Sequence, residues 1–388
     1  MRLSVLHEDF GVEPRVAASP DTVKRFVGLG AEVVVASGAG LASGVLDADY
    51  TSAGASIAAT NAAAVKGADV VLGVRRPSAA QLKGVTPGAL VVAIMDPYGH
   101  EAELAELAGT GASLIAMELM PRITRAQVMD VLSSQANLAG YRAVIDASAE
   151  FGRAFPMMMT AAGTVPAARV FVMGAGVAGL QAVATARRLG AVVSATDVRP
   201  ASKEQVESLG AKFIAVEDDE FKQAETSGGY AKPMSAEYQA KQAALVATHI
   251  AKQDIVITTA LIPGRAAPKL VTAEMVASMK PGSILVDLAV ERGGNVEGAR
   301  GGEVVTTPNG AKIVGHLNVP GRLAATASQL YAKNLYAFLE TQIDKATKAL
   351  AVKWDDELVK ATLLTKGGAV VHPAFSKADV VPEAAPAG

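Results

Sequence analysis

The amino-acid sequence predicts an α/β protein with two doubly wound parallel-sheet domains. Short runs of Val, Ile, Leu and Ala recur along the chain, and segments with helical periodicity separate them. Continuous apolar runs of this kind are typical of strands that are buried on both faces, as in parallel sheets. The 388 residues are 50% hydrophobic but only 4% aromatic, so we expect aliphatic cores, and the length suffices for two or three domains.

The N-terminal half is predicted to alternate strands with helices. Ser19 before Pro20 marks a helix start, because serine can cap a free amide and proline fits the first helical position. A long helix is expected at about residues 125–151. The predicted strands are residues 3–7, 32–36, 69–74, 89–94 and 113–120.

The second half repeats this alternation. A strand at residues 169–173 precedes a helix at 177–189, which Gly190 ends as a C-terminal cap. Another long helix follows Pro320 and extends to about residue 343. The other predicted strands are residues 192–196, 212–216, 254–259, 283–288 and 312–315.

The phrase Leu-Gly-Ala occurs at residues 29–31, 189–191 and 209–211, each time between a predicted helix and a predicted strand. Glycine favours the left-handed conformation that ends many helices. We interpret the phrase mainly as shared turn chemistry. It also suggests two similar βα halves.

The two long helices bracket the second half, so the chain is predicted to cross over and return. We predict a discontinuous first domain of residues 1–135 plus 320–380, a second domain of residues 136–319, and a disordered tail at 381–388. Both domains are expected to be Rossmann-like, linked by the long helices, with a cleft between them as the default ligand site.

Residues 217–236 interrupt the alternation of strands and helices. Their central part, residues 225–234, is polar and Gly-rich and contains one aromatic residue, Tyr230. Loops of this length often act as lids. We predict a mobile loop that closes over a flat ligand. The alternative is that these residues are a surface insertion without a function.

Composition excludes several classes of function. The formal net charge is −2, and no basic block points to nucleic acid. The absence of cysteine excludes disulfides, thiolate chemistry and zinc–thiolate sites, and no metal site is predicted. The N-terminus lacks the apolar core of a signal peptide, and no apolar run approaches the ~18–20 residues that span a bilayer. We therefore expect a soluble, cytoplasmic chain.

The motif Gly174-Ala-Gly176-Val-Ala-Gly179 lies between a predicted strand and a predicted helix. In this context the glycines permit a tight turn, close approach of a pyrophosphate, and close packing of the helix on the strand. The pyrophosphate then binds free N–H groups at the helix N-terminus. We predict that a dinucleotide binds at Gly174, Gly176, Val177, Ala178 and Gly179.

Asp197 comes at the end of the next predicted strand. An acidic residue there can accept hydrogen bonds from the adenine ribose hydroxyls, and its charge repels a 2′-phosphate. The pattern therefore predicts NAD(H) as the cofactor. A Gly-rich turn that only packs a helix on a strand is the alternative.

Five segments carry a resemblance to a known family: residues 118–146, 172–181, 228–232, 257–264 and 315–320. They closely resemble domain I, the NAD(H)-binding component of proton-translocating nicotinamide nucleotide transhydrogenase. The resemblance covers nearly the whole chain. Its most specific portion is Pro-Arg-Ile-Thr-Arg-Ala-Gln-Val-Met-Asp at residues 121–130.

The resemblance implies roles for this specific stretch. Arg122 and Ser133 would fix the carboxamide end of the nicotinamide, Asp130 would hold Arg122, and Gln127 would reach toward the second nucleotide. The residues alone allow less: Arg122 and Asp130 can pair, Gln127 can donate to a ligand, or the stretch is only a solvated helix start.

The resemblance also implies further contacts with the cofactor. Arg199 follows Asp197 closely, and its positive charge can weaken the rejection of NADP(H). The other implied contacts are Val198, Gly229, Tyr230, Gln242, Ala260 and Leu261.

Alanine dehydrogenase has a similar architecture and is the alternative. Its reaction needs a lysine and a histidine in the cleft to handle protons. This chain has Arg75-Arg76-Pro77 and Met95-Asp96 at the matching places, although it retains the substrate-anchoring Arg15. Of its five histidines, only His316 is a candidate for lying near the nicotinamide. A nucleotide-binding module without chemistry is a third interpretation.

The resemblance thus implies direct hydride transfer from NADH to NADP⁺ held by an NADP(H)-binding partner subunit. Membrane-spanning subunits would couple this transfer to proton translocation. It further implies a homodimer, peripheral on the cytoplasmic face of the inner membrane.

Overall fold

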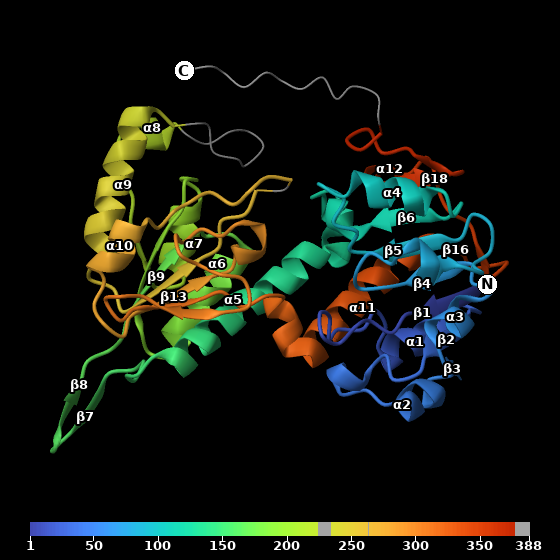
Figure 1. Cartoon of the computed structure of the whole chain (residues 1–388), viewed down its shortest axis with the longest axis horizontal. Coiled ribbons are helices and arrows are strands. Elements are labelled where there is room, and N and C mark those ends of the chain that lie inside the picture. The colour runs from blue at the N-terminus through green and yellow to red at the C-terminus, as the bar shows by residue number, and fades with distance from the viewer. Residues whose placement is uncertain (224–233, 263, 377–388) are drawn as a thin grey trace. The chain divides into compact units, whose positions relative to one another are not determined.

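The computed structural model describes residues 1–223, 234–262 and 264–376, which divide into two compact units (Figure 1). Unit 1 consists of Met1–Gln135 together with the described residues from Leu323 onward, and unit 2 of Ala136–Arg322. Each unit contains one large, mainly parallel sheet, so the predicted α/β fold is confirmed. Among the described residues, no helix is long and apolar enough to cross a membrane.

Unit 1 has an eight-stranded sheet in the order β19-β18-β6-β5-β4-β1-β2-β3. Neighbouring strands from β3 to β6 pair in parallel, whereas β18 is antiparallel to β6 and to β19. The strands are β1 (Arg2–Val5), β2 (Glu32–Ala36), β3 (Ser56–Ala58), β4 (Val70–Leu72), β5 (Leu90–Ala93), β6 (Ser113–Ala116), β18 (Leu363–Lys366) and β19 (Ala369–Val370). A separate ribbon pairs β16 (Ile343–Asp344) with β17 (Ala349–Leu350).

Helices connect these strands. Helix α1 begins as predicted, with the Ser19 hydroxyl accepting a hydrogen bond from the Thr22 amide and proline at the first position. The others are α2 (Asp47–Ser52), α3 (Asn61–Val65), α4 (Glu101–Ala108), α11 (Ala324–Glu340) and α12 (Glu357–Thr362), with α1 at Pro20–Gly28. Short 3₁₀ turns occupy Leu41–Ser43, Ala79–Leu82, Met117–Leu119 and Thr124–Met129.

Unit 2 has a seven-stranded sheet in the order β11-β10-β9-β12-β13-β15-β14, in which only β14 is antiparallel. The strands are β9 (Arg169–Met173), β10 (Val192–Thr196), β11 (Lys212–Phe213), β12 (Ile255–Thr258), β13 (Ile284–Asp287), β14 (Val304–Thr306) and β15 (Lys312–Val314). An exposed hairpin of β7 (Met158–Thr160) and β8 (Gly163–Val165) projects from this unit (Figure 1).

The helices of unit 2 follow its strands. They are α6 (Val177–Arg188), α7 (Ser202–Ser208), α8 (Asp219–Lys222), α9 (Ala236–Ile250) and α10 (Ala273–Ser278), with a 3₁₀ turn at Val290–Arg292. Helix α5 (Val131–Glu150) and the 3₁₀ turn at Val319–Leu323 carry the chain across the two unit boundaries.

Both sheets are buried on both faces. In β5, Leu90 and Val92 pack into one apolar cluster while Val91 and Ala93 pack into another. The same alternation holds in β9, where Val170 and Val172 face a different cluster from Phe171 and Met173. This double burial explains why the strands form continuous apolar runs in the sequence.

Several elements differ from the sequence-based expectation. The strand predicted at residues 113–120 ends at Ala116, and the helix predicted from residue 125 is a 3₁₀ turn followed by α5, which begins at Val131. Strands β3, β14, β16 to β19 and the β7–β8 hairpin were not predicted. Most of them have only two or three residues, too few to show a period.

Candidate functional site

The Gly-rich motif forms the turn from β9 into α6. Gly174 has φ +104°, and a Cβ added there would lie 2.4 Å from the Thr259 hydroxyl oxygen at the end of β12. A Cβ on Gly179 would lie 1.8 Å from the Gly174 carbonyl oxygen. Gly174 is therefore required because its backbone has a positive φ and it packs closely on Thr259. Gly179 is required because it packs closely on the Gly174 carbonyl.

The second glycine has a different role. A Cβ added at Gly176 would meet nothing within 4 Å among the described residues. Gly176 is the N-cap of α6 and supplies no side chain to the amides that follow, including those of Val177 and Ala178. An open space above free helix N-terminal amides is what a pyrophosphate requires, so these residues fit a dinucleotide.

Asp197 follows β10 directly and ties the Gly-rich turn to the strand end. Its Oδ2 accepts a hydrogen bond of 2.7 Å from the Ala175 amide. Its Oδ1 accepts from the Arg199 amide at 2.9 Å, and the Arg199 guanidinium donates to both oxygens. Burial alone would raise the pKa of Asp197, but the hydrogen bonds from Arg199 and Ala175 hold it below the usual value. Asp197 is therefore an oriented carboxylate at neutral pH.

The strand order of unit 2 reverses beside β9, because β10 and β11 lie on one side and β12 and β13 on the other. Ligands of open α/β sheets bind at this switch point, outside the carboxyl ends of the strands. Gly174 and Thr259 follow the two strands that flank it. Sequence and topology thus indicate the same position for the cofactor.

The segment after β12 is held by a residue that sequence reasoning missed. Asn295 is fully buried, accepts a hydrogen bond from the Ala260 amide at 3.0 Å, and donates to the Ala260 carbonyl at 2.9 Å. It also donates to the Pro268 carbonyl. Asn295 fixes the backbone at Ala260, and the neighbouring Leu261 is exposed.

The other residues of unit 2 that were predicted to contact the cofactor differ in their surroundings. Gln242 on α9 donates to the Thr196 hydroxyl at 3.2 Å and accepts from the Val216 amide at 2.9 Å, so it braces the end of β10. Val198 is exposed. Gly229, Tyr230 and the tail at 381–388 lie outside the described residues.

His316 lies near the end of β15. Burial and the charge of Arg322 lower the pKa of His316 below its usual value. Arg322 also pairs with Asp146 at 3.1 Å. A contact of His316 with the nicotinamide remains a prediction.

The stretch from Arg122 to Ser133 lies in unit 1. Both oxygens of Asp130 accept hydrogen bonds from Ser133, at 2.8 Å from its amide and 2.5 Å from its hydroxyl. Asp130 therefore caps α5. Arg122 is exposed, and among the described residues it forms no hydrogen bond or ion pair, so the expected pairing with Asp130 is not formed here.

The rest of this stretch is anchored so that Gln127 faces outward. Ala126 and Met129 are buried, whereas Gln127 and Val128 are exposed. Arg125 forms ion pairs with Asp356 and Glu357, both at 2.9 Å. The 3₁₀ turn thus presents Gln127 on a fixed backbone.

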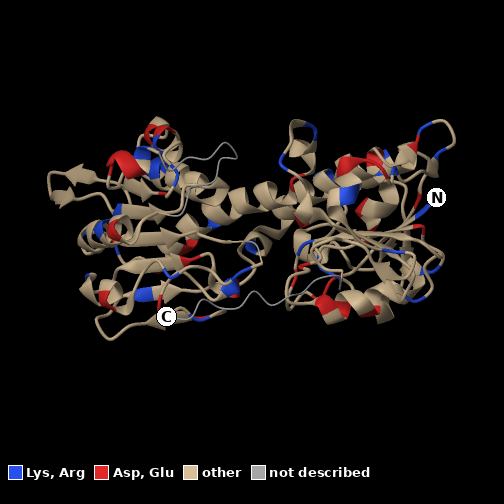
Figure 2. Cartoon of the chain, turned by 90° about the horizontal axis from the view of Figure 1, so that it is seen from above, with Lys and Arg blue, Asp and Glu red and all other residues tan. Residues whose placement is uncertain are grey.

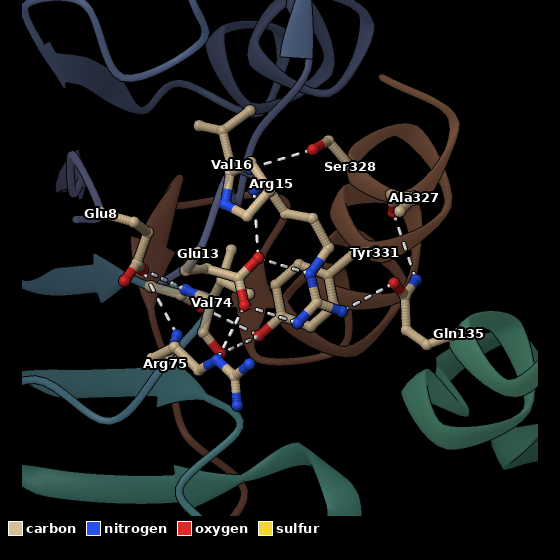
Figure 3. A network of polar contacts seen from close by, with 12 residues as sticks. Glu8, Glu13, Arg15, Val16, Val74, Arg75, Gln135, Ala327, Ser328 and Tyr331 are labelled. Carbon is tan, nitrogen blue, oxygen red and sulfur yellow. Dashed lines mark hydrogen bonds and ion pairs between the residues drawn. The ribbon is translucent and has the colours of Figure 1, made fainter. Parts of the chain in front are cut away.

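A dense polar network occupies the carboxyl ends of β1 and β4 in unit 1 (Figure 3). Glu13 accepts two hydrogen bonds of 2.7 Å from the Arg15 guanidinium and one of 2.7 Å from that of Arg75. Arg15 also donates to the Gln135 side chain at 2.8 Å. Glu13 and Arg15 are buried, so this is an interior ion pair rather than an open anion site.

Two further groups complete the network. Glu8 accepts hydrogen bonds from the Val74 and Arg75 amides, but burial raises its pKa to about 7. The Tyr331 hydroxyl donates to the Gly73 carbonyl at 2.9 Å. Sequence reasoning identified only Arg15 and Arg75 here, because the other members carry no recognisable motif.

The residues matched above to the lysine and the histidine of alanine dehydrogenases have structural contacts in this chain. Arg75, at the place of the lysine, donates to Glu13 at 2.7 Å. The Arg76 guanidinium donates to the Met95 and Asp96 carbonyls at 2.6 and 2.8 Å. Glu118 accepts from the amides of the same two residues. Arg76 and Glu118 therefore brace the turn after β5, where Asp96 has φ +46°.

Charge is distributed evenly in both units. Basic and acidic side chains are interspersed along each of them, without a large region of one sign (Figure 2). This agrees with the formal net charge of −2.

Comparisons with known proteins agree with the geometry. The family models "Alanine dehydrogenase/PNT, N-terminal domain" and "Alanine dehydrogenase/PNT, C-terminal domain" match residues 4–139 and 143–373. An NAD(P) transhydrogenase alpha subunit of Rhodospirillum rubrum is 55% identical over 381 residues, which are 97% of this chain and 99% of that protein.

A crystal structure of a transhydrogenase from Sinorhizobium meliloti superimposes with a TM-score of 0.87 at 64% identity, covering 96% of this chain and 100% of that one. The alanine dehydrogenase of Halomonas elongata is 30% identical, over 97% of this chain and 96% of that protein. The chain therefore belongs to the alanine dehydrogenase/PNT family, among its transhydrogenase alpha subunits.

Proposed function

We propose that this chain is the NAD(H)-binding component of a proton-translocating transhydrogenase and that it passes a hydride directly between NADH and NADP⁺ on a partner subunit. The observation that carries the proposal is the turn from β9 into α6. There, Gly176 leaves open space and uncapped amides beside the oriented carboxylate of Asp197. The 55% identity to a transhydrogenase alpha subunit supports the same reaction.

The residues of the chain would bind and orient the cofactor rather than move protons. The amides of Val177 and Ala178 would hold the pyrophosphate, and Asp197 would hold the adenine ribose. Bound NADH supplies the hydride. Because transfer between two nicotinamides moves no separate proton, the site needs geometry and exclusion of water more than an acid or a base.

The stretch from Arg122 to Ser133 in unit 1 would contact both the nicotinamide of NADH and the second nucleotide. Arg122 and Ser133 would orient the carboxamide of the nicotinamide, and Gln127 would reach the second nucleotide. The exposure of Arg122 and Gln127, with Ala126 and Met129 buried beneath them, supports this assignment. Asp130, bonded to Ser133, would act by positioning that side chain.

An alanine dehydrogenase activity is less well supported. Arg15, which would anchor the substrate carboxylate, is buried and held by Glu13 and Gln135. Arg75 takes the place of the lysine and pairs with Glu13, and Met95-Asp96 takes the place of the histidine. No lysine or histidine is therefore available to donate a proton at those positions.

We further propose that the chain forms a homodimer, which docks with an NADP(H)-binding subunit and membrane-spanning subunits on the cytoplasmic face of the inner membrane. The start of the β7–β8 hairpin supports a protein contact, because Met158 and Met159 in β7 and the preceding Met157 are 46, 72 and 63% exposed. Three adjacent exposed methionines are costly in water unless a partner covers them. Light scattering of Met158→Asp should show a monomer if this hairpin joins two copies.

One experiment tests the reaction. The purified chain is mixed with NADH, NADP⁺ and a soluble NADP(H)-binding domain, and NADPH formation is followed by stopped flow. Rapid transfer that needs both proteins is expected, and Gln127→Asn should slow it while NADH affinity changes little. Alanine-dependent formation of NADH by the chain alone would instead establish the dehydrogenase.

A further inference from the structure

The carboxylate of Asp197 accepts four hydrogen bonds within the chain. Oδ1 accepts from the Arg199 amide and from Arg199 Nε, both at 2.9 Å. Oδ2 accepts from the Ala175 amide at 2.7 Å and from Arg199 Nη2 at 3.0 Å. A carboxylate offers about four lone-pair positions, so a ribose hydroxyl can bind Asp197 only if one of these donors leaves.

The four donors differ in how easily they can leave. The Ala175 amide belongs to the turn that packs against Thr259, and the Arg199 amide belongs to the chain just after β10. Moving either of them would distort the turn or the strand end. The Arg199 guanidinium sits on a flexible side chain that is 34% exposed, whereas the Asp197 side chain is only 8% exposed. The guanidinium is the donor that can exchange.

We propose that the Arg199 side chain is an exchangeable partner of Asp197, displaced by the adenine ribose, and that it sets how strictly the site selects NAD(H) over NADP(H). The proposal rests on the proposed function, because it takes the ribose of NAD(H) to bind Asp197. Arg199 keeps its positive charge throughout, so once displaced it remains beside the ribose.

The physical consequence concerns the 2′-phosphate of NADP(H). Asp197 alone would repel that phosphate, and this repulsion is the usual basis of selection. A cation held within two residues of Asp197 cancels much of the repulsion and can itself pair with phosphate. At the partial exposure of this site, the loss of one such charge should change discrimination by about five- to tenfold at low salt.

The test compares NADH and NADPH affinities of the whole chain by isothermal titration calorimetry. For Arg199→Ala, the ratio of the NADPH to the NADH dissociation constant should rise about five- to tenfold. NADH should bind at least as tightly as to the wild type, because its competitor for Asp197 is gone. The increase in the ratio should shrink as salt is raised, which a merely structural role for Arg199 would not produce.

Two variants serve as controls. Arg188→Ala removes an exposed arginine from the other end of α6 and should leave the ratio unchanged. Arg199→Lys keeps the charge but loses the two-pronged geometry, and it should keep a ratio close to that of the wild type. An unchanged or lower ratio in Arg199→Ala, with NADH still bound, would overturn the inference. Failure of the wild type to bind NADH would instead overturn the proposed function.

Discussion

The two units share one strand order but differ at the end of their central strand. Both sheets contain six parallel strands in the order third, second, first, fourth, fifth, sixth. In unit 2 the chain passes from β9 through Gly174 and Gly176 straight into α6, which has no side-chain cap. In unit 1 residues 6–19 separate β1 from α1, and Ser19 caps that helix.

The end of the first parallel strand is therefore open in unit 2, after β9, and filled by side chains in unit 1, after β1. At the end of β1, the buried Glu13 accepts hydrogen bonds from the buried Arg15 and from Arg75, whose side chain is 37% exposed. At the end of β9, Gly176 leaves a space that no described atom fills, and no described side chain caps the first amides of α6. Topology alone does not make a nucleotide site; the site depends on whether the turn leaves the helix N-terminus free.

Gly179→Ala is the strongest way to break the open turn. The new Cβ would lie 1.8 Å from the Gly174 carbonyl oxygen, so the backbone must move. NADH binding should be lost, and unit 2 should be destabilised by about 1–3 kcal/mol or more. Calorimetry with NADH measures the first effect. Gly28→Ala lies at a helical position where a Cβ would meet no described atom outside its own helix, so it should leave binding intact. Normal NADH affinity in Gly179→Ala would contradict the packing argument.

Glu13→Gln tests the filled position in unit 1. The change leaves Arg15 buried without its carboxylate partner, which typically costs about 3–5 kcal/mol. The fluorescence of Trp354, the one tryptophan, reports unfolding of unit 1 in denaturant. NADH affinity should be retained, since Glu13 belongs to unit 1.

An exposed ion pair supplies the control for Glu13→Gln. Glu32 pairs with Arg2 but its side chain is 62% exposed. Glu32→Gln should therefore cost less than about 1 kcal/mol. Equal losses in the two variants would show that the Glu13 network is not a buried charge cluster.

Gly176→Ala tests whether ligand binding can be weakened without destabilising the turn. Gly176 has φ −75° and ψ −168°, which alanine can adopt, and the added Cβ meets no described atom. Unfolding should change little. NADH binding should weaken about ten- to hundredfold, because the methyl group occupies the space of the pyrophosphate and disturbs charged hydrogen bonds. Wild-type affinity would rule out a pyrophosphate above Gly176.

Local signals in the sequence predict the turn from β9 into α6 but not the polar network at the end of β1. Gly174, Gly176 and Asp197 lie within one strand–helix–strand unit, so their spacing predicts their meeting. Glu8 and Tyr331 are brought to one place only by the return of the chain in α11. Asn295 reaches Ala260 from 35 residues away and belongs to no motif. Contacts of this kind depend on tertiary packing, which a single sequence does not show.

Glu118→Gln tests the protonation state of the buried carboxyl groups in unit 1. Burial raises the pKa of Glu118 to about 7, and its Oε2 has no hydrogen-bond partner among the described residues. Because the folded pKa lies above the ordinary 4.5, protonated Glu118 stabilises the fold fully below pH 4.5, and this contribution is lost as the pH rises through 7. The wild type should thus lose stability between about pH 5 and 8.

The glutamine variant keeps an oxygen for the Met95 and Asp96 amides but cannot ionise. It should be more stable than the wild type at pH 8, by about 1–2 kcal/mol, and lose less stability across this range. Glu8, whose pKa is also raised to about 7 by burial, accounts for the slope that remains. Glu8→Gln alone should remove a similar share, and the double variant should be nearly flat when Trp354 fluorescence is followed from pH 5 to 8. If the double variant kept the full wild-type slope, the pH dependence would originate outside Glu8 and Glu118. Both carboxyl groups would then be ionised in the folded protein across this pH range.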